Sequence, residues 1–559
     1  MPGLLGFTKR AFESDDYIGV LKKMQRVVTY YPCYLVDRIF EDRNLCATRV
    51  TNGIINKELQ PYTKNNVHIW LDGEFYNRSS FQKNFTSDLS LLCEYYRNGE
   101  LIQFLRRVDG IFSSVIYDQK NQSLKIITDR FGLRHLFLRR SENGYIWASE
   151  IKPFLFIPSY SPSVTPGSVD QFIKEGHFCG SVTWFSDVRL IEPATIITID
   201  LKTNKAVSNS YWSVNEIRRP AQRLSDIDEM AHEAGRLLKK AVNKRCDPGE
   251  SIGISLSGGL DSRALLAAFP QDHTPSPQTL TFGSPDCLDV RIAKKVAAIR
   301  NYPHTVHVID ENNWMTNRCK GVWWTDGQFN LIHMHGIEQL NAIKNLYHIE
   351  LNGFLGDAIL GGTYIRGNNG MQNMFRDRGR RFIAMGLVIG NALIHTRIPF
   401  MDNDLYEFTL TVPERFLKNG FFYKKVLLHT FPDFFSGIPW QKTGLPITRN
   451  NCQVFLKYSF ERVLDKISTI LPITPRNRSF TNYSNLLCTQ TSRILLEKLF
   501  NNDDALIFNY VDPVKIRTHI VQSKNGIDKS EIVGRYMTLE IWLRQIAEKN
   551  CISIDELLC

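Results

Sequence analysis

A strand, turn and helix in the middle of the chain constrain its fold more than any other feature. The apolar, β-branched run that begins at Ile254 is typical of a buried strand and ends at Leu256. Two adjacent glycines, Gly258 and Gly259, follow it, and residues 263–269 have the composition of a helix. Glycine has no Cβ, so this turn lets the backbone approach an anion, to which the helix N-terminus presents N–H groups. The pattern therefore predicts an anion-binding loop in an α/β domain.

The polar side chains of this loop indicate a nucleotide held with a divalent cation. Ser257 and Ser262 supply hydroxyl groups, and Asp261 would repel a phosphate unless a cation lay between them, so we interpret it as a magnesium ligand. The loop matches neither G-x-x-x-x-G-K-[ST] nor G-x-G-x-x-G. It resembles the pyrophosphate loop of the ATP pyrophosphatases, which implies cleavage of ATP between the α- and β-phosphates. A tight βα turn with no ligand is the structural alternative.

Length, charge and cysteine usage narrow the class of protein. A chain of 559 residues predicts two or three domains. The net charge of +11 is dispersed, so we expect neither a nucleic-acid partner nor a dense basic surface. No run approaches the roughly 18 apolar residues of a membrane span, and the N-terminus lacks the pattern of a signal peptide. The 11 scattered cysteines contain no C-x-x-C, which predicts free thiols in a cytoplasmic protein.

The first two hundred residues predict a separate α+β domain. Short apolar runs alternate with turn residues, and helical periodicity appears at 88–96 and 99–106, without a strict βαβ order. The predicted strands and the turns that follow them are 67–71 before Asp72-Gly73, 111–117 before Asp118, and 124–128 before Asp129.

Several motifs in this half and the next give the chain a family resemblance. Residues 71–77, 108–112, 128–136 and 148–152 resemble the glutaminase domain of the asparagine synthetases. That family includes β-lactam synthetases and lasso-peptide cyclases. The resemblance implies an Ntn-hydrolase-like α+β domain over residues 1–210. It also implies an α/β ATP-pyrophosphatase domain, of the adenine nucleotide α-hydrolase-like type, over 225–559, with a parallel sheet and a helical C-terminal part. A homodimer is a candidate assembly.

The N-terminal domain departs from the family pattern at two positions that glutamine hydrolysis requires. The family uses a cysteine at position 2, whose thiol attacks the glutamine amide, but this chain has Pro2. Asp72 replaces the asparagine that donates to the oxyanion, and a carboxylate would repel that charge. We therefore predict an inactive glutaminase domain. A different thiol, Cys33 or Cys46, reaching the pocket is the one way in which activity could persist.

The resemblance also implies the residues of a nucleotide site. Phe282 ends the next predicted strand, 278–282, at the position that touches adenine, and Asn352 and Gly353 match positions that approach ribose and adenine. Asp357 matches the second magnesium-binding aspartate. The expected cofactors are ATP and Mg²⁺, and the expected nucleotide-binding residues are Leu256, Ser257, Gly258, Gly259, Asp261, Ser262, Phe282, Asn352 and Gly353.

Five further positions bear on catalysis and on the substrate. Lys442, in register with the family segment that ends at Pro446, matches a lysine that contacts phosphate and the developing oxyanion. With Asp261 and Asp357 it completes the predicted catalytic set. Phe354 and Ala358 replace acidic residues of the family pattern, which argues against aspartate as substrate. For His333 and His335 we favour packing in the core or substrate pocket over metal binding.

These observations favour an AMP-forming ligase that adenylates a carboxylate and couples it to an amine without hydrolysing glutamine. Its partners would be small-molecule or peptide carboxylates and amines, and an intramolecular amine would make the protein a cyclase. The runner-up is an asparagine synthetase that uses aspartate and ammonia. The sequence is also compatible with a non-catalytic binding protein on the same fold and with a nucleotidyl-dependent RNA-modifying enzyme, although it favours neither.

Overall fold

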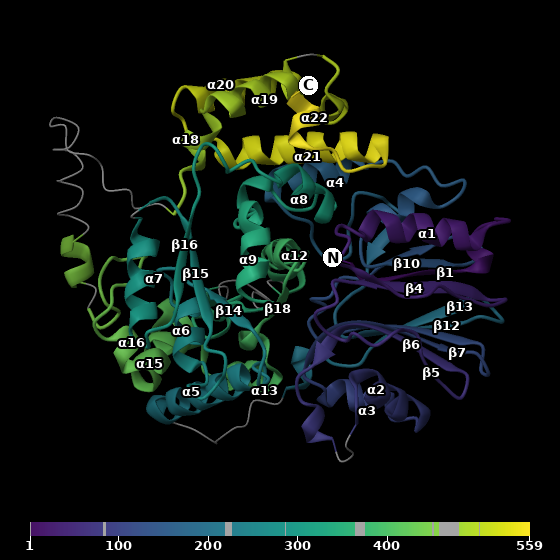
Figure 1. The fold of residues 1–559 in the computed structure, drawn as a ribbon, viewed down its shortest axis with the longest axis horizontal. Coiled ribbons are helices and arrows are strands. Elements are labelled where there is room, and N and C mark those ends of the chain that lie inside the picture. The colour runs from purple at the N-terminus through teal and green to yellow at the C-terminus, as the bar shows by residue number, and fades with distance from the viewer. Residues whose placement is uncertain are drawn as a thin grey trace.

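Two different architectures follow one another along the chain, as Figure 1 shows. The structure is a computed structural model, and it describes residues 2–81, 85–217, 226–285, 287–363, 375–449, 452–457, 480–501 and 503–558. In the described residues an antiparallel β-rich half precedes a parallel α/β half, in agreement with the fold class expected from the sequence.

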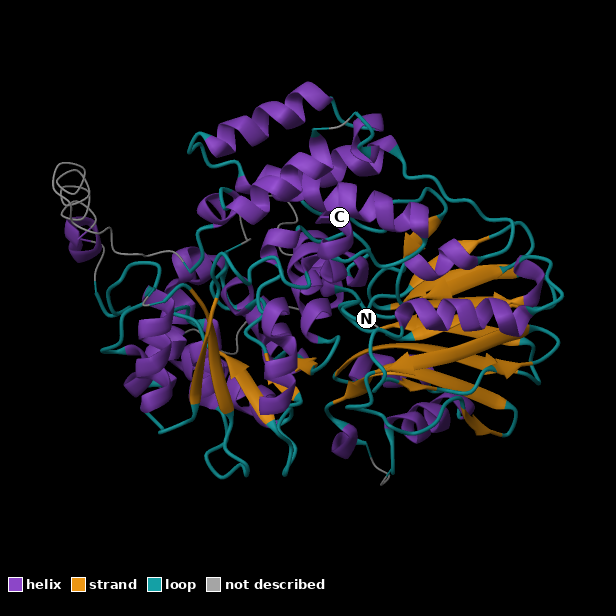
Figure 2. Cartoon of the chain, turned by 45° about the horizontal axis from the view of Figure 1, so that its top comes forward, coloured by secondary structure: helices purple, strands orange, loops and turns teal. Residues whose placement is uncertain are grey.

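The N-terminal half consists of two stacked antiparallel sheets with helices on both outer faces (Figures 1 and 2). Trp70 and Trp147 lie in the apolar layer between the sheets. Helix α1 (Tyr17–Val28) covers one outer face, while α2 (Asp88–Arg97) and α3 (Leu101–Arg107) cover the other. One sheet contains β1 (Leu4–Thr8), β2 (Leu35–Val36), β3 (Phe40–Glu41), β4 (Leu45–Thr51), β9 (Phe137–Arg140), β10 (Tyr145–Ala148) and β11 (Val188–Leu190). The other contains β5 (Tyr62–Lys64), β6 (Val67–Phe75), β7 (Gly110–Asp118), β8 (Ser123–Thr128), β12 (Thr195–Asp200) and β13 (Lys205–Ser210).

The turn that the sequence predicts at Asp72-Gly73 is wrong, because β6 continues through both residues. Gly73 pairs with Phe112 of β7 while its φ is +113°, a conformation that favours glycine. A Cβ at Gly73 would lie 2.0 Å from the carbonyl oxygen of Ile111. Glycine here therefore allows a local distortion and a close strand approach within a continuous ladder.

The second half is a doubly wound parallel sheet. Its strand order is β16-β15-β14-β17-β18, so the chain reverses direction across the sheet between β14 and β17. Such a switch point at the carboxyl ends of strands is where α/β sheets bind ligands. The strands are β14 (Ile252–Ser255), β15 (Gln278–Gly283), β16 (His304–Val308), β17 (Ile349–Leu351) and β18 (His395–Arg397).

Helices cover both faces of this sheet (Figure 1). One face packs against α5 (Ile227–Asn243), α6 (Asp261–Ala268), α7 (Leu288–Ala298) and α15 (Phe421–Thr430). The other packs against α8 (Arg318–Trp324), α9 (Leu340–Leu346) and α12 (Ala384–Gly390).

The C-terminal part is helical, as expected, but it lies one layer farther from the sheet. Helix α21 (Ser530–Glu548) packs against α8, which separates it from the strands (Figure 1). The expectation for residues 458–479 lies outside the described residues. The neighbouring helices are α18 (Tyr483–Leu487), α19 (Gln490–Phe500), α20 (Pro513–Lys524) and α22 (Ile554–Leu558). Among the described helices, none combines the length and the hydropathy needed to cross a bilayer.

Buried ion pairs join the two halves. The ammonium of Lys152 is fully buried and contacts the carboxylates of Glu150 and Asp326. Asp326 belongs to the second half, and its Oδ1 lies 2.9 Å from the Lys152 Nζ. Burial alone would lower the pKa of Lys152, but Asp326 and Glu150 hold it above its ordinary value. A second junction pairs Glu74 with Arg397 at 2.8 Å. These pairs fix the position of the first domain against the second.

We expect Lys152→Met to destabilise the protein by about 3–5 kcal/mol, because it leaves two buried carboxylates without a cation. Chemical denaturation measures the free energy of unfolding. The matched control is Lys174→Met, whose side chain is 82% exposed, and its effect should stay within about 0.5 kcal/mol. Equal effects of the two substitutions would refute this account of the junction.

Candidate nucleotide and ligase site

The predicted phosphate loop lies between β14 and α6, and its shape is fixed by side-chain oxygens. Ser257 N–H donates to Ser262 Oγ at 3.1 Å, and Gly259 N–H donates to Ser257 Oγ at 3.2 Å. Gly258 N–H donates to Asp289 Oδ1 at 2.8 Å. The structure thus brings together the loop residues found from the sequence and adds Asp289, which no motif in the sequence indicated. Side-chain oxygens of the chain itself accept from these three N–H groups, so a phosphate would bind through the serine hydroxyls and the N-terminus of α6 or would replace those acceptors.

The two predicted metal-binding aspartates lie next to each other. Asp357 N–H donates to Asp261 Oδ2 at 3.2 Å, although the residues are 96 positions apart. This approach requires glycine, because a Cβ at Gly353 would lie 3.0 Å from the Asp261 Cβ and one at Gly356 would lie 2.7 Å from its Cγ. The loop after β17 therefore packs directly on the N-terminus of α6 and brings both carboxylates to one site.

The electrostatics of this pair fit a divalent cation. Burial raises the pKa of Asp261 to about 7, and the neighbouring Asp357 carboxylate contributes to the rise. Tyr423 O–H donates to Asp261 Oδ1 at 2.8 Å, which orients the carboxylate. Oxygen ligands of this kind are those that Mg²⁺ prefers. Within the described residues no three His, Cys, Asp or Glu side chains form a metal cluster, so a cation here would take its other ligands from phosphate and water.

The backbone between the two glycines is strained. Leu355 has φ +62° and ψ 14°, a left-handed conformation, and its side chain is buried. For a residue with a Cβ this conformation costs roughly 1–2 kcal/mol. Packing of Leu355 in the core below the site offsets that cost and holds the turn that precedes Asp357.

Lys442 lies on a hairpin that is bonded to the phosphate loop. Residues 440–445 form a short antiparallel bridge, and Gln441 N–H donates to the Gly258 carbonyl at 3.0 Å. Buried Arg263 donates both to that carbonyl, at 3.2 Å, and to the Pro439 carbonyl, at 2.8 Å. The Lys442 side chain is exposed, and its Nζ lies 5.5 Å from the centre of the Trp440 ring. The hairpin thus presents a cation beside the loop.

A cavity of about 240 Å³ lies at the carboxyl end of the sheet, and Leu256 is not among its lining residues but is buried and donates its N–H to the Leu280 carbonyl at 2.7 Å. Phe282 lines the cavity and stacks on His307, with ring centres 5.8 Å apart. Asn352, His333 and His335 also line it. His333 Nε2 lies 2.8 Å from Glu531 Oε1, and His335 Nδ1 lies 2.6 Å from the Tyr483 hydroxyl.

The two residues of the N-terminal domain that depart from the family pattern, Pro2 and Asp72, lie close to each other. Pro2 is buried, and a Cβ on the adjacent Gly3 would lie 3.0 Å from Asp72 Oδ2. Asp72 is itself 3.7 Å from Arg134. Of the two alternative thiols, exposed Cys33 contacts Lys344 and Cys46 packs in the core beneath α1.

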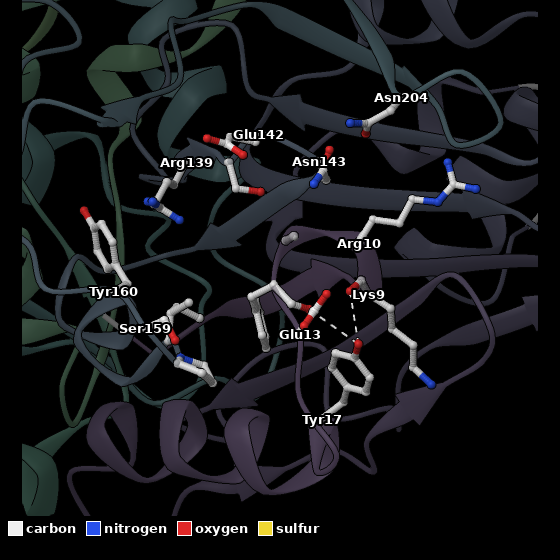
Figure 3. Close-up of a pocket in the computed structure, with 15 residues that line it drawn as sticks. Lys9, Arg10, Glu13, Tyr17, Arg139, Glu142, Asn143, Ser159, Tyr160 and Asn204 are labelled. Atoms are coloured by element: carbon white, nitrogen blue, oxygen red, sulfur yellow. Dashed lines mark hydrogen bonds between the residues drawn. The ribbon is translucent and has the colours of Figure 1, made fainter.

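A larger cavity of about 620 Å³ lies on the N-terminal domain (Figure 3). Charged side chains such as Arg10, Glu13 and Glu142 surround it, and Tyr17 donates to the Lys9 carbonyl at 3.3 Å. It contains none of the residues predicted for catalysis or nucleotide binding.

Both halves of the chain match known protein families. The family model of the glutamine amidotransferase domain matches residues 39–212, and that of asparagine synthase matches residues 233–381. The chain is 26% identical over 259 residues to asparagine synthetase [glutamine-hydrolyzing] 2 of Bacillus subtilis, covering 42% of this chain and 33% of that protein. It is 24% identical over 440 residues to the Homo sapiens asparagine synthetase [glutamine-hydrolyzing], covering 67% and 71% of the two chains.

Among solved structures, glutamine phosphoribosylpyrophosphate amidotransferase from B. subtilis matches with a TM-score of 0.26 and 10% identity, over 55% of this chain and 80% of that one. The two domain matches and the similarity to asparagine synthetases identify an ATP-dependent carbon–nitrogen ligase with an amidotransferase-type domain at its N-terminal side. Within that class, the chain belongs to the asparagine synthetase family.

We expect Asp261→Asn to stabilise the metal-free protein increasingly as pH rises from 5 to 8. The raised pKa of about 7 means that the folded state holds a proton that the unfolded state releases above pH 4. Wild-type stability therefore falls as pH rises through that window, by roughly 1–3 kcal/mol once solvent screening is allowed for.

Thermal melts in EDTA across this pH range measure the difference between variant and wild type. Asp272→Asn, at an exposed position, is the control and should follow wild type. A difference that does not change with pH would contradict the assignment.

Proposed function

We propose that the protein is an AMP-forming amide ligase that adenylates a carboxylate and couples it to an amine without hydrolysing glutamine. The observation that carries this proposal is the convergence of three parts on one place. The phosphate loop, the adjacent Asp261 and Asp357 carboxylates, and the Lys442 hairpin bonded to that loop come from three separate segments of the chain.

Each part has a distinct role in the proposed reaction. The loop and the N-terminus of α6 would bind phosphate oxygens, while Leu256, Phe282, Asn352 and Gly353 would surround the nucleoside. Asp261 and Asp357 would hold Mg²⁺, which when bound neutralises charge on the departing pyrophosphate. Lys442 would stabilise the oxyanion that forms when the amine attacks the acyl-adenylate.

The N-terminal domain supports the glutamine-independent form of this reaction. A thioester requires a thiol beside the oxyanion site, and the chain has Pro2 and Asp72 there. An acidic side chain at the oxyanion position opposes the developing negative charge. The amine would therefore be free ammonia or, in our preferred version, an amino group on a larger molecule, including an intramolecular one.

The second candidate is an asparagine synthetase that uses aspartate and ammonia, which the names of the relatives favour. Against it, the substrate side of the loop after β17 carries Phe354 and Ala358, both buried. Pyrophosphate release measured with aspartate plus ammonium separates the two. Robust asparagine formation would establish the second candidate and remove the larger amine.

We expect Lys442→Ala to lower product formation by about 10²- to 10³-fold while leaving the affinity for ATP largely unchanged, because the lysine acts on charge that develops during the reaction. Pyrophosphate release and calorimetric titration of ATP measure the two properties. Lys515→Ala, at an exposed position on α20, is the control. Unaffected turnover in Lys442→Ala would refute the role of this residue, and absence of ATP binding by wild type would refute the ligase itself.

We expect the double substitution Pro2→Cys with Asp72→Asn to release glutamate from glutamine, whereas wild type does not. The thiol supplies the nucleophile and the amide supplies an oxyanion donor. Pro2→Cys alone should remain at least about tenfold weaker, because Asp72 still opposes the oxyanion. Glutamate release in an enzyme-coupled assay measures this, and glutaminase activity in the wild-type protein would overturn the glutamine-independent proposal.

A further inference from the structure

A buried carboxyl group lies at the floor of the 240 Å³ cavity next to the nucleotide loop. Glu350 is in the middle of β17, is 7% exposed, and lines the cavity. The residue that follows Asn352 in the same segment is Gly353, which packs on Asp261. The cavity is therefore next to the candidate ligase site, on the other face of the sheet from α6.

The neighbouring strand β14 packs closely against Tyr347 and bonds to Glu350. Gly253 pairs with Glu350 in the ladder, and a Cβ at Gly253 would lie 2.1 Å from the ring of Tyr347. Ser255, two residues along β14, shares the face of Glu350 and donates to its Oε1 at 2.5 Å. The cavity therefore has a polar floor made by Ser255, Glu350 and Asn352, and it shares Asn352 and Phe282 with the proposed nucleoside site.

Most of the cavity wall is apolar, and the described lining residues include His333 and His335 but no lysine or arginine. The walls come from the segments around α9 and α12, and their aliphatic residues are Leu340, Ile343, Ile383, Leu387, Ile389 and Ile394. An apolar cavity of about 150 Å³ is large enough to bind benzene, so this one has room for an aliphatic or aromatic group of side-chain size.

No cation among the described residues accompanies the Glu350 carboxylate, whereas several other buried carboxylates of this protein are paired with one. Glu74 is paired with Arg397, and Asp402 with Arg245. Around Glu350 the described residues offer only neutral donors, and both contacts to its Oε2, from Asn352 and Thr396, are long at 3.4 Å. Burial raises the pKa of Glu350, while hydrogen bonds from Ser255 and others oppose the rise. A buried acid of this kind is stabilised as a carboxylate by a cation in hydrogen-bond reach.

We propose that this cavity binds the amine substrate, with the ammonium group paired to Glu350 and an aliphatic or aromatic body against the walls of α9 and α12. The inference rests on the proposed ligase function and assigns the class of its amine. A primary ammonium supplies the short donor that Oε2 lacks among the described residues, and charge-assisted hydrogen bonds of this kind are the strong ones.

The test uses two probes that differ only in the amino group. Leucinamide carries an ammonium on an isobutyl body, and 4-methylpentanamide has the same body without it. Calorimetric titration of the full-length wild-type protein, without ATP, should show binding of leucinamide and much weaker binding of 4-methylpentanamide. Because no turnover is needed, the result is independent of whether the protein forms pyrophosphate.

Glu350→Gln should weaken leucinamide binding by roughly 10- to 100-fold, as expected for a lost charge-assisted hydrogen bond, and should leave the affinity for ATP unchanged. Glu350→Met serves the same purpose if the glutamine variant fails to fold. Glu338→Gln is the matched control, because both of its carboxyl oxygens are also buried although the residue does not line the cavity.

Three outcomes would overturn the assignment. Equal binding of the two probes, or no binding of leucinamide to wild type, would show that the cavity does not recognise an ammonium group. Loss of ATP affinity rather than leucinamide affinity in Glu350→Gln would make the cavity part of the nucleotide site. Loss of the ligase reaction in pyrophosphate assays, with leucinamide binding intact, would instead count against the proposed function alone.

Discussion

The close approach of two loops across the switch point of the parallel sheet is the constraint on which the candidate site depends. Gly353 and Gly356 let the segment after β17 contact the first turn of α6. That contact places Asp261 and Asp357 side by side and leaves Asp261 with a pKa near neutrality. Two like charges held together without a cation destabilise the fold. Such an arrangement is typical of a site in which stability is lost for the sake of binding.

The N-terminal domain carries Pro2 where the family pattern has a cysteine, and its contacts with the second half give it a structural role. Glu74 follows the altered oxyanion position by two residues and forms a buried ion pair with Arg397 at the end of β18. Burial would raise the pKa of Glu74, but Arg397 and His395 hold it well below its ordinary value. Removing the domain would deprive Arg397 of Glu74 and Asp326 of Lys152. The domain therefore acts as a structural partner of the ligase sheet, independent of any chemistry of its own.

Local signals in the sequence predict the site well where its residues are close together along the chain. The phosphate loop, its serines and the strand and helix on either side of it follow from residues 254–269 alone. Tyr423, Asp289 and Arg263 could not be assigned roles in this way, because each acts on the site through contacts between distant segments. Their side chains are common in cores and on helices, and only the fold shows what they face. The incorrect turn at Asp72-Gly73 shows a different limit, because residue types that favour turns also favour distortions within a strand.

The chemistry of the cavity beside the ligase site bears on which substrate the fold can accept. Aspartate would bring an ammonium and two carboxylates, and one carboxylate remains beside the ammonium after the other is adenylated. The described lining of the cavity offers that group no arginine or lysine, and it presents Glu350 instead. Like charges in a low-dielectric setting repel strongly, whereas an ammonium on an apolar body matches both the acid and the walls. The arrangement therefore favours an apolar amine in this cavity and an anionic substrate group on the side of the loop where Lys442 lies.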